Sequence, residues 1–151
     1  MLEGEYDPDE VEPKWQKEWV EKKTYAYDSS SVKDRNDVFS IDTPPPTVSG
    51  HLHIGHLYQH TLQDFVARFR RMSENAVFFP FGYDDNGIAS EILTEEELGV
   101  RHQDYSRREF QEMCREVCQK YEEEFKENMQ SLAFSMDWNN TYKTIEPRVQ
   151  K

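Results

Sequence analysis

Three consecutive prolines at positions 44–46 follow directly on a short apolar segment, VFSID at 38–42. Proline fixes φ, lacks a backbone N–H and forces the residue before it into an extended conformation. The stretch 43–50 therefore cannot be helical. We expect a buried strand over 38–42 and a loop that leaves its carboxyl end.

Helical and strand patterns alternate after this loop. Segment 52–72 spaces apolar residues at helical intervals and ends in arginines that complement the helix dipole. Segment 77–79 is a second strand candidate, 81–87 is a turn-rich loop, and 88–98 is a helix closed by a glycine. This order predicts an α/β fold with parallel strands, in which ligands bind beyond the carboxyl ends of the strands. Both loops are expected there.

The two ends of the chain supply further helices. Asp7 can cap a helix that ends near residue 23, and its Trp15 and Trp19 are expected to pack in the core. A capping box at 106–109 predicts a helix to about residue 132. A turn over 137–140 and a strand over 141–145 should follow. The acidic runs 95–97 and 122–124 are expected to face solvent.

Composition narrows the class of protein. The chain has 151 residues, the size of one domain, and a net charge of −12, which disfavours a protein that grips a nucleic-acid backbone unaided. No stretch approaches the roughly 20 apolar residues that a membrane helix needs, so we expect no membrane association. Cys114 and Cys118, four residues apart in a helical pattern, suit reduced thiols in a cytoplasmic protein.

Four of the five histidines lie between positions 51 and 60. A zinc site is a poor explanation, because no glutamate lies between His56 and His60 and no cysteine or acid is near in sequence. The segment HIGH at 53–56 instead begins a helix, where free N–H groups and the positive end of the dipole favour phosphate. His53 and His56 can face one anion, and Gly55 lets a flat ring lie against the backbone.

Three segments together resemble the class I aminoacyl-tRNA synthetases, and within them the valine-specific members. They are IDTPPPTVSGHLHIGH at 41–56, YDPDEVEPKWQKEW at 6–19, similar to the opening helix, and FGYDDNGIA at 81–89, similar to the second substrate loop in its archaeal form. The resemblance implies one partial domain over 1–151, the N-terminal half of a Rossmann-type catalytic fold. We divide it into a helix and loop (1–37), a strand–helix–strand unit (38–99) and a helical segment leading to an editing insertion (100–151).

The resemblance also implies a reaction and an ATP site. Valine would attack the α-phosphate of ATP, which carries Mg²⁺, and the valyl group of the adenylate would pass to tRNA(Val). His53 and His56 would contact the triphosphate as charge develops. Gly55 would make room for adenine, and Thr47 would border the nucleotide. No metal held by the protein itself is expected.

The valine site is implied by the same resemblance. Pro45, Pro46 and Thr47 would frame the side chain of valine, and Asp84 would hold its ammonium group. A carboxylate is the natural partner of an ammonium, and rigid prolines suit a small branched side chain. Asp84 and Asp85 could instead cap the following helix, and the prolines could serve only to end the strand.

The catalytic lysine loop of the family, the second half of its fold and its anticodon-binding domain have no counterpart in this sequence. We therefore expect a fragment with an exposed sheet edge and apolar face, prone to self-association or marginal stability. One alternative is a non-catalytic module that binds nucleotide or needs a separate C-terminal half. Another is a small nucleotidyltransferase of the wider His-x-Gly-His superfamily, which would leave the prolines unexplained.

Overall fold

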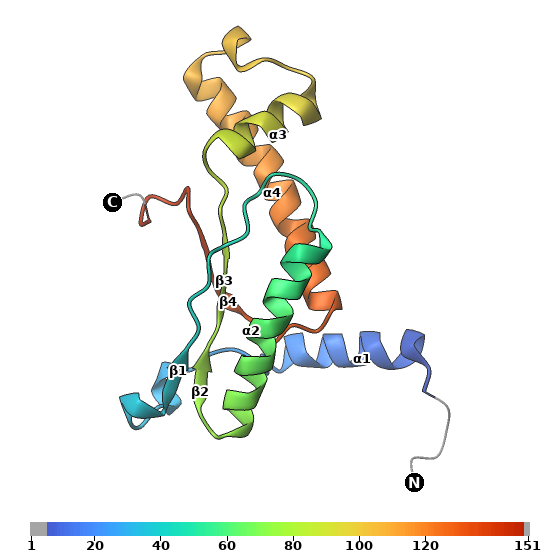
Figure 1. Cartoon of the computed structure of the whole chain (residues 1–151), viewed down its shortest axis with the longest axis vertical. Helices are drawn as coiled ribbons and strands as arrows, with labels where there is room; N and C mark the ends of the chain where they lie inside the picture. Colours follow the sequence, from blue (N-terminus) through green and yellow to red (C-terminus); the bar gives the residue numbers. More distant parts are fainter. Residues whose placement is uncertain (1–5, 150–151) are drawn as a thin grey trace.

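The computed structural model describes residues 6–149, so the first five and last two residues of the expected domain lie outside it. The chain alternates between helices and short strands (Figure 1). The elements are α1 (Pro8–Glu21), β1 (Val38–Ser40), α2 (Ile54–Met72), β2 (Ala76–Phe78), β3 (Pro80–Tyr83), α3 (Ile88–Leu98), α4 (Arg107–Ser131) and β4 (Asp137–Lys143). Single turns of 3₁₀ helix occur at Ser29–Ser31, Arg35–Asp37 and His102–Asp104. None of the described helices is long and apolar enough to cross a bilayer.

The paired strands of the fold run parallel. β1 pairs with β2, with Phe39 opposite Val77, and β3 pairs with β4, with Gly82 opposite Tyr142. Helix α2 connects the first two strands, and α2 and α4 lie lengthwise beside the strands, while α1 projects from the body (Figure 1). The predicted α/β class with parallel strands and flanking helices is confirmed.

Two boundary predictions were wrong. Residues 81–83 were assigned to a loop and 137–140 to a turn, yet they belong to β3 and β4. The glycine that suggests a turn has another use, because a Cβ on Gly82 would lie 2.3 Å from Cζ of Tyr142 on the paired strand. Gly82 lets an aromatic ring lie across the sheet, and this long-range contact outweighs the local turn signal.

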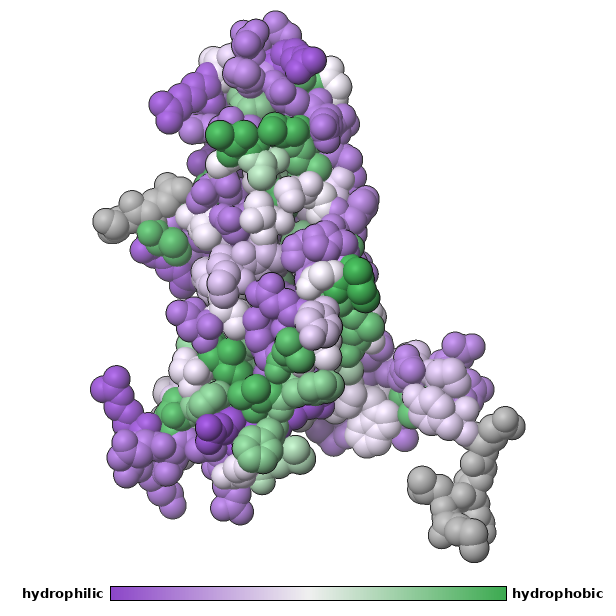
Figure 2. Space-filling model, in the orientation of Figure 1, coloured by the Kyte–Doolittle hydropathy of each residue, from purple (hydrophilic) through white to green (hydrophobic). Residues whose placement is uncertain are grey.

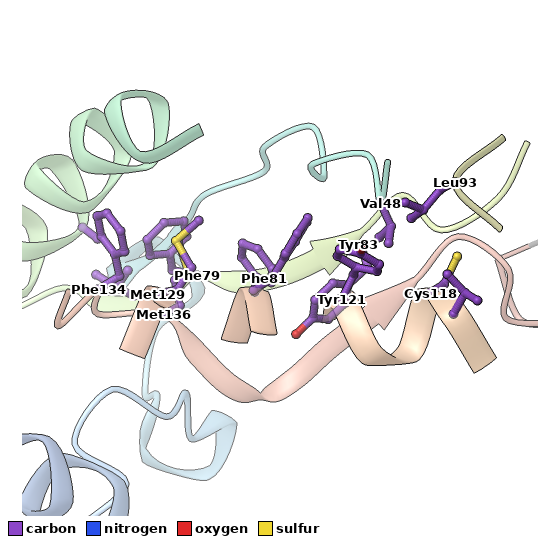
Figure 3. Packing of buried hydrophobic residues seen from close by; sticks show 14 residues of the cluster. Val48, Phe79, Phe81, Tyr83, Leu93, Cys118, Tyr121, Met129, Phe134 and Met136 are labelled. Atoms are coloured by element: carbon purple, nitrogen blue, oxygen red, sulfur yellow. The ribbon is translucent and has the colours of Figure 1, made fainter. Parts of the chain in front are cut away.

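The core lies between β3 and the inner face of α4 (Figure 3). Phe79, Phe81 and Tyr83 point from the strand toward helix residues such as Tyr121 and Met129 (Figure 3). Helix α4 begins with the predicted capping box, in which Ser106 and Glu109 exchange side-chain hydrogen bonds with each other's N–H groups. Helix α3 ends as predicted at Gly99, whose φ of 64° is left-handed.

The expectation that Trp15 and Trp19 are core residues was wrong. Helix α1 has no buried residue, and Trp15 is 41% exposed. The two indoles stack on each other instead, with ring centroids 6.3 Å apart. Helix-spaced aromatic residues pack only where another element faces them. Here α1 leaves a cavity of about 820 Å³ between itself and the C-terminal end of α4.

Helix α2 turns a polar face inward and much of its apolar face outward. His60, Asp64 and Ala67 are buried, whereas Phe65 is 63% exposed and Phe69 59% exposed. Apolar side chains gather along the course of this helix on the surface (Figure 2). The exposed apolar residues of α2 are Ile54, Tyr58, Leu62, Phe65, Val66, Phe69 and Met72.

The arginines that end α2 do more than complement its dipole. Arg68 pairs with Asp64 at 2.7 Å, and Arg71 donates to the hydroxyl and carbonyl of Ser135 at 2.6 and 2.8 Å. The Asp64 carboxylate also accepts the backbone N–H of Ser135 at 2.7 Å. This network fastens α2 to the segment between α4 and β4, a role that sequence reasoning did not foresee.

Candidate functional site

The triple-proline loop and the loop after β3 are joined by backbone hydrogen bonds. The N–H of Asp84 donates to the carbonyl of Pro46 at 3.0 Å, and the N–H of Val48 donates to the carbonyl of Asp84 at 2.8 Å. Thr47 and Asp84 form the resulting parallel bridge. Pro46 takes part only as an acceptor, which is the one backbone role a proline can fill. The loop after β1 therefore continues the sheet on β3.

The Asp84 carboxylate is held from two sides. Its Oδ2 accepts a hydrogen bond from Thr47 Oγ1 at 3.1 Å, and its Oδ1 lies 3.2 Å from Thr144 Oγ1. Asp84 is half-buried, so the carboxylate keeps access to solvent. A partly desolvated carboxylate fixed by two hydroxyls can receive a cationic group such as an ammonium.

The proline loop is itself anchored. Pro46 is buried and Pro45 half-buried, and Val48 is 0% exposed. The hydroxyl of Ser90, in the first turn of α3, donates to the carbonyl of Val48 at 3.1 Å. The loop is thus held rigidly beside Asp84.

His53 and His56 form a reciprocal cap at the start of α2. Nδ1 of His53 accepts the N–H of Gly55 at 3.1 Å, and Nδ1 of His56 accepts the N–H of His53 at 3.4 Å. The two rings stack with centroids 3.9 Å apart. An Nδ1 that accepts carries no proton, so each neutral ring holds its proton on Nε2. Each ring can then donate from Nε2 to an anion at the helix N-terminus.

Burial and charge favour the neutral form of His56. Partial burial lowers the pKa of His56, and the nearby His53 lowers it further. Gly55 fits tightly against His53, because a Cβ there would lie 2.9 Å from Cε1 of the His53 ring. Gly55 is therefore needed to seat His53, in addition to the room it was expected to leave for adenine.

Among the described residues, no hydrogen bond joins the histidine pair to the Asp84 group. Both groups lie along helix α4. His51 pairs with Glu124 at 2.7 Å and the His56 ring lies 6.4 Å from that of Phe125, while the carbonyl of Asp85 contacts the Cys118 thiol at 3.9 Å. Residues 118–125 of α4 thus form a shared wall. The cavity beside α1 is lined by none of the candidate site residues.

His60 is buried and packs against the core. It is 2% exposed, its Nδ1 lies 2.9 Å from Oε1 of Gln63, and its ring packs 5.4 Å from that of Phe81. Burial lowers the pKa of His60, and the Gln63 contact offsets part of this effect. Within residues 6–149, no three His, Cys, Asp or Glu side chains gather in a way that could hold a metal ion.

One alternative and one expectation about acids near the site were wrong. Asp85 does not cap α3, whose N-cap residue is Gly87 and which has no side-chain cap. The Asp85 carboxylate accepts the N–H of Ile145 at 3.0 Å instead. Glu122 does not face solvent, since it is 4% exposed and forms an ion pair with Lys143. Its position, four residues after Cys118 on the apolar face of α4, was a signal that could have revealed its burial.

Sequence comparison places this chain among known proteins. It is 69% identical to a valine–tRNA ligase of Haloarcula marismortui over 150 residues, which are 99% of this chain and 16% of that protein. It is 45% identical to a valine–tRNA ligase of Rickettsia felis over 97% of this chain and 17% of the relative. The chain thus spans about a sixth of the length of these relatives.

Structural comparison agrees with the sequence. The chain superimposes on agnB2 LeuRS of Agrobacterium radiobacter K84, solved in a ternary complex with tRNA and LeuAMS, with a TM-score of 0.77. The identity is 27%, and the match covers 96% of this chain and 17% of that one. A family model for class I tRNA synthetases (I, L, M and V) matches residues 14–151. On this match, and on the loops that join at Asp84, the chain belongs to the class I tRNA synthetase family.

Proposed function

We propose that this chain carries the ATP- and valine-binding half of a valine–tRNA ligase site, within a longer enzyme that makes valyl-adenylate and transfers the valyl group to tRNA(Val). The observation that carries the proposal is the junction of the proline loop with Asp84. It sets an apolar wall and a carboxylate side by side, the pair of features needed to hold a small apolar amino acid. The 69% identity to a valine–tRNA ligase favours valine as that amino acid.

The proposed reaction depends on placement and charge. The carboxylate oxygen of valine attacks the α-phosphorus of ATP, the bond to the β-phosphate oxygen breaks, and pyrophosphate leaves. A ribose hydroxyl at the end of tRNA then takes the valyl group, and AMP leaves. The protein forms no covalent bond, so alignment and stabilisation of developing charge must supply the rate.

Each candidate residue has a role in this scheme that suits its chemistry. His53 and His56 donate from Nε2 to triphosphate oxygens, and Gly55 leaves the helix start open to the nucleotide. Thr47 borders both substrates, because its hydroxyl contacts Asp84 while its backbone follows the prolines. The donor set suits phosphate oxygens. Mg²⁺ would arrive with the triphosphate, and no ligand from this chain is assigned to it.

Pro45 and Pro46 would contact the valine side chain while Asp84 binds its ammonium. A wall of this kind discriminates by only about 1–3 kcal/mol per methylene. A complete enzyme therefore needs editing as well, which this chain is not proposed to provide. Free thiols at Cys114 and Cys118 support a cytoplasmic location for the enzyme.

Valine-dependent exchange of pyrophosphate into ATP tests the proposal. It is measured for this chain, where weak or no exchange is expected, and for a longer protein that contains it. His56→Ala should abolish most of the exchange in the longer protein. The matched control is His51→Ala, which removes an exposed histidine paired with Glu124 and should leave the rate unchanged. Exchange that does not respond to His56→Ala, or no exchange in the longer protein, would overturn the proposal.

A second candidate is a binding module that acts only with a separately encoded C-terminal half. The exposed apolar face of α2 favours it, because a face of that kind is normally covered in a complete enzyme. Mixing this chain with such a half should restore exchange. If the mixture shows no exchange although one continuous protein is active, this alternative is excluded.

A further inference from the structure

Behind Asp84 lies a buried cluster of charged side chains that the proposed reaction does not use. Asp85 and Glu122 are each only 4% exposed, and Lys143 forms an ion pair with Glu122. The Asp85 carboxylate accepts the backbone N–H of Ile145 at 3.0 Å. Burial raises the pKa of Glu122, and the ion pair with Lys143 offsets part of this effect. Such a cluster is costly to bury, and core packing alone does not require it.

Thr144 connects this cluster to Asp84. Its Oγ1 lies 3.2 Å from Asp84 Oδ1 and 3.1 Å from Asp85 Oδ1, and it accepts the N–H of Asp85 at 3.1 Å. Thr144 is itself fixed by its N–H, which donates to the carbonyl of Tyr83 at 3.0 Å. Its hydroxyl proton can go to one carboxylate at a time. Asp85 Oδ1 already accepts the N–H of Ile145, so it keeps a hydrogen-bond donor when the Thr144 hydroxyl donates to Asp84.

We propose that Thr144, fixed by Asp85 and by the ion pair of Lys143 with the buried Glu122, is a positioning residue that orients the Asp84 carboxylate for the ammonium group of an amino acid. The inference rests on the proposed function, since it specifies how the ammonium site is organised. Thr47 holds Oδ2 and Thr144 holds Oδ1, so the carboxylate is fixed before the ligand arrives. Fixing it in advance reduces the entropy lost on binding.

The role of Lys143 follows from its place in the chain. It directly precedes Thr144, and its ion pair with Glu122 attaches the end of β4 to α4. Lys143→Met would leave Glu122 buried and unpaired and free the backbone next to Thr144. The effect on Asp84 should then resemble that of losing the Thr144 hydroxyl.

The test uses carboxyl-detected NMR on the 151-residue chain, with the Asp84 side-chain carbon as reporter. The chain is titrated with three compounds: valine, isobutylamine, which keeps the ammonium, and 3-methylbutanoate, which keeps only the carboxylate. Valine and isobutylamine should shift the Asp84 signal, and 3-methylbutanoate should not. Asp84→Asn should abolish binding of both ammonium compounds, which tests the proposed site independently of its positioning.

Thr144→Val removes the hydroxyl and keeps the shape. We expect it to weaken binding of both ammonium compounds about five- to tenfold, the usual cost of one hydrogen bond that supports a charged group. In the wild type, the NMR couplings across χ1 of Asp84 are expected to report one rotamer. In Thr144→Val the same couplings should be averaged over several rotamers. Thr144→Ser should restore both. Thr141→Val is the matched control, since the Thr141 hydroxyl makes no hydrogen bond among the described residues.

The outcomes separate the two proposals. Loss of binding in Asp84→Asn with unchanged binding and rotamer in Thr144→Val would overturn the positioning role and leave the ammonium site standing. No response of the wild-type Asp84 signal to either ammonium compound would overturn both. Should Thr144→Val fail to give a folded spectrum, Thr144→Ala and Lys143→Met replace it, and unchanged affinity in both would also overturn the positioning role.

Discussion

The imidazoles of His53 and His56 cap their own helix, each through Nδ1, while their rings stack with centroids 3.9 Å apart. The pair thus has a structural role in addition to any contact with phosphate. These two roles can be separated, because the cap uses Nδ1 and the proposed phosphate contact uses Nε2.

His53→Ala should destabilise the chain by about 1 kcal/mol, the usual cost of losing a helix N-cap. His53→Asn keeps a side-chain acceptor at the same position and should retain most of the stability. Urea denaturation checks both values. If the cap and the phosphate contact are separate functions, His53→Asn will keep the stability and lose the exchange activity of the longer protein. Equal stability of His53→Ala and wild type would show that the cap contributes nothing.

Gly55→Ala should be destabilising, although alanine is favoured over glycine in a helix by about 1 kcal/mol. The new Cβ would meet the His53 ring at 2.9 Å and displace it from the cap. In a His53→Ala background that ring is absent, so the same change should become stabilising. A double-mutant cycle of unfolding free energies measures this reversal of sign. Additive effects would show that the ring and Gly55 do not interact.

His60 should make stability fall in mild acid. Its pKa is lowered in the folded chain, mainly by burial, so below about pH 6.5 the unfolded chain binds a proton that the folded chain resists. The contribution of neutral His60 to the free energy of unfolding is therefore complete above about pH 6.5. It is lost as the pH falls toward the lower pKa that His60 has in the folded chain. The slope can reach about 1.4 kcal/mol per pH unit. His60→Leu should remove this part of the slope between pH 7 and 5, and parallel curves for the two proteins would contradict the assignment.

Local signals were sufficient for the parts of the site that lie within one segment. The prolines dictated the loop over 43–50, and the residues HIGH predicted a helix start, where His53 is the N-cap. The capping box at Ser106 and the stop at Gly99 were likewise visible in a few adjacent residues. These features depend on backbone geometry and caps, which the sequence specifies over short distances.

Features that depend on distant partners were missed. The residues around Gly82 predicted a turn. The ring of Tyr142, which leaves no room for a larger residue at position 82, is sixty residues away in sequence. Glu122 looked solvated because Lys143 could not be placed beside it from the sequence. The apolar pattern of α2 predicted a helix correctly but not which of its faces is buried. A side chain's burial is a property of the whole fold.

The exposed face of α2 leads to a final prediction, that this chain self-associates. Phe65 and Phe69, one turn apart, are 63% and 59% exposed, and burying such rings against a second copy releases about 25 cal/mol per Å². Sedimentation velocity should show the mass rising with concentration. Phe65→Ser with Phe69→Ser should weaken association at least about tenfold and change stability little, because both rings are already in water.

Val20→Ser is the matched control, since Val20 is 60% exposed on α1, away from this face, and its loss should leave association unchanged. A wild-type chain that stays monomeric at every concentration and melts at high temperature would contradict the prediction. It would mean that the apolar face of α2 is tolerated in water without a partner. Association that survives the double substitution would instead place the contact on another surface, such as the unpaired edge of β1.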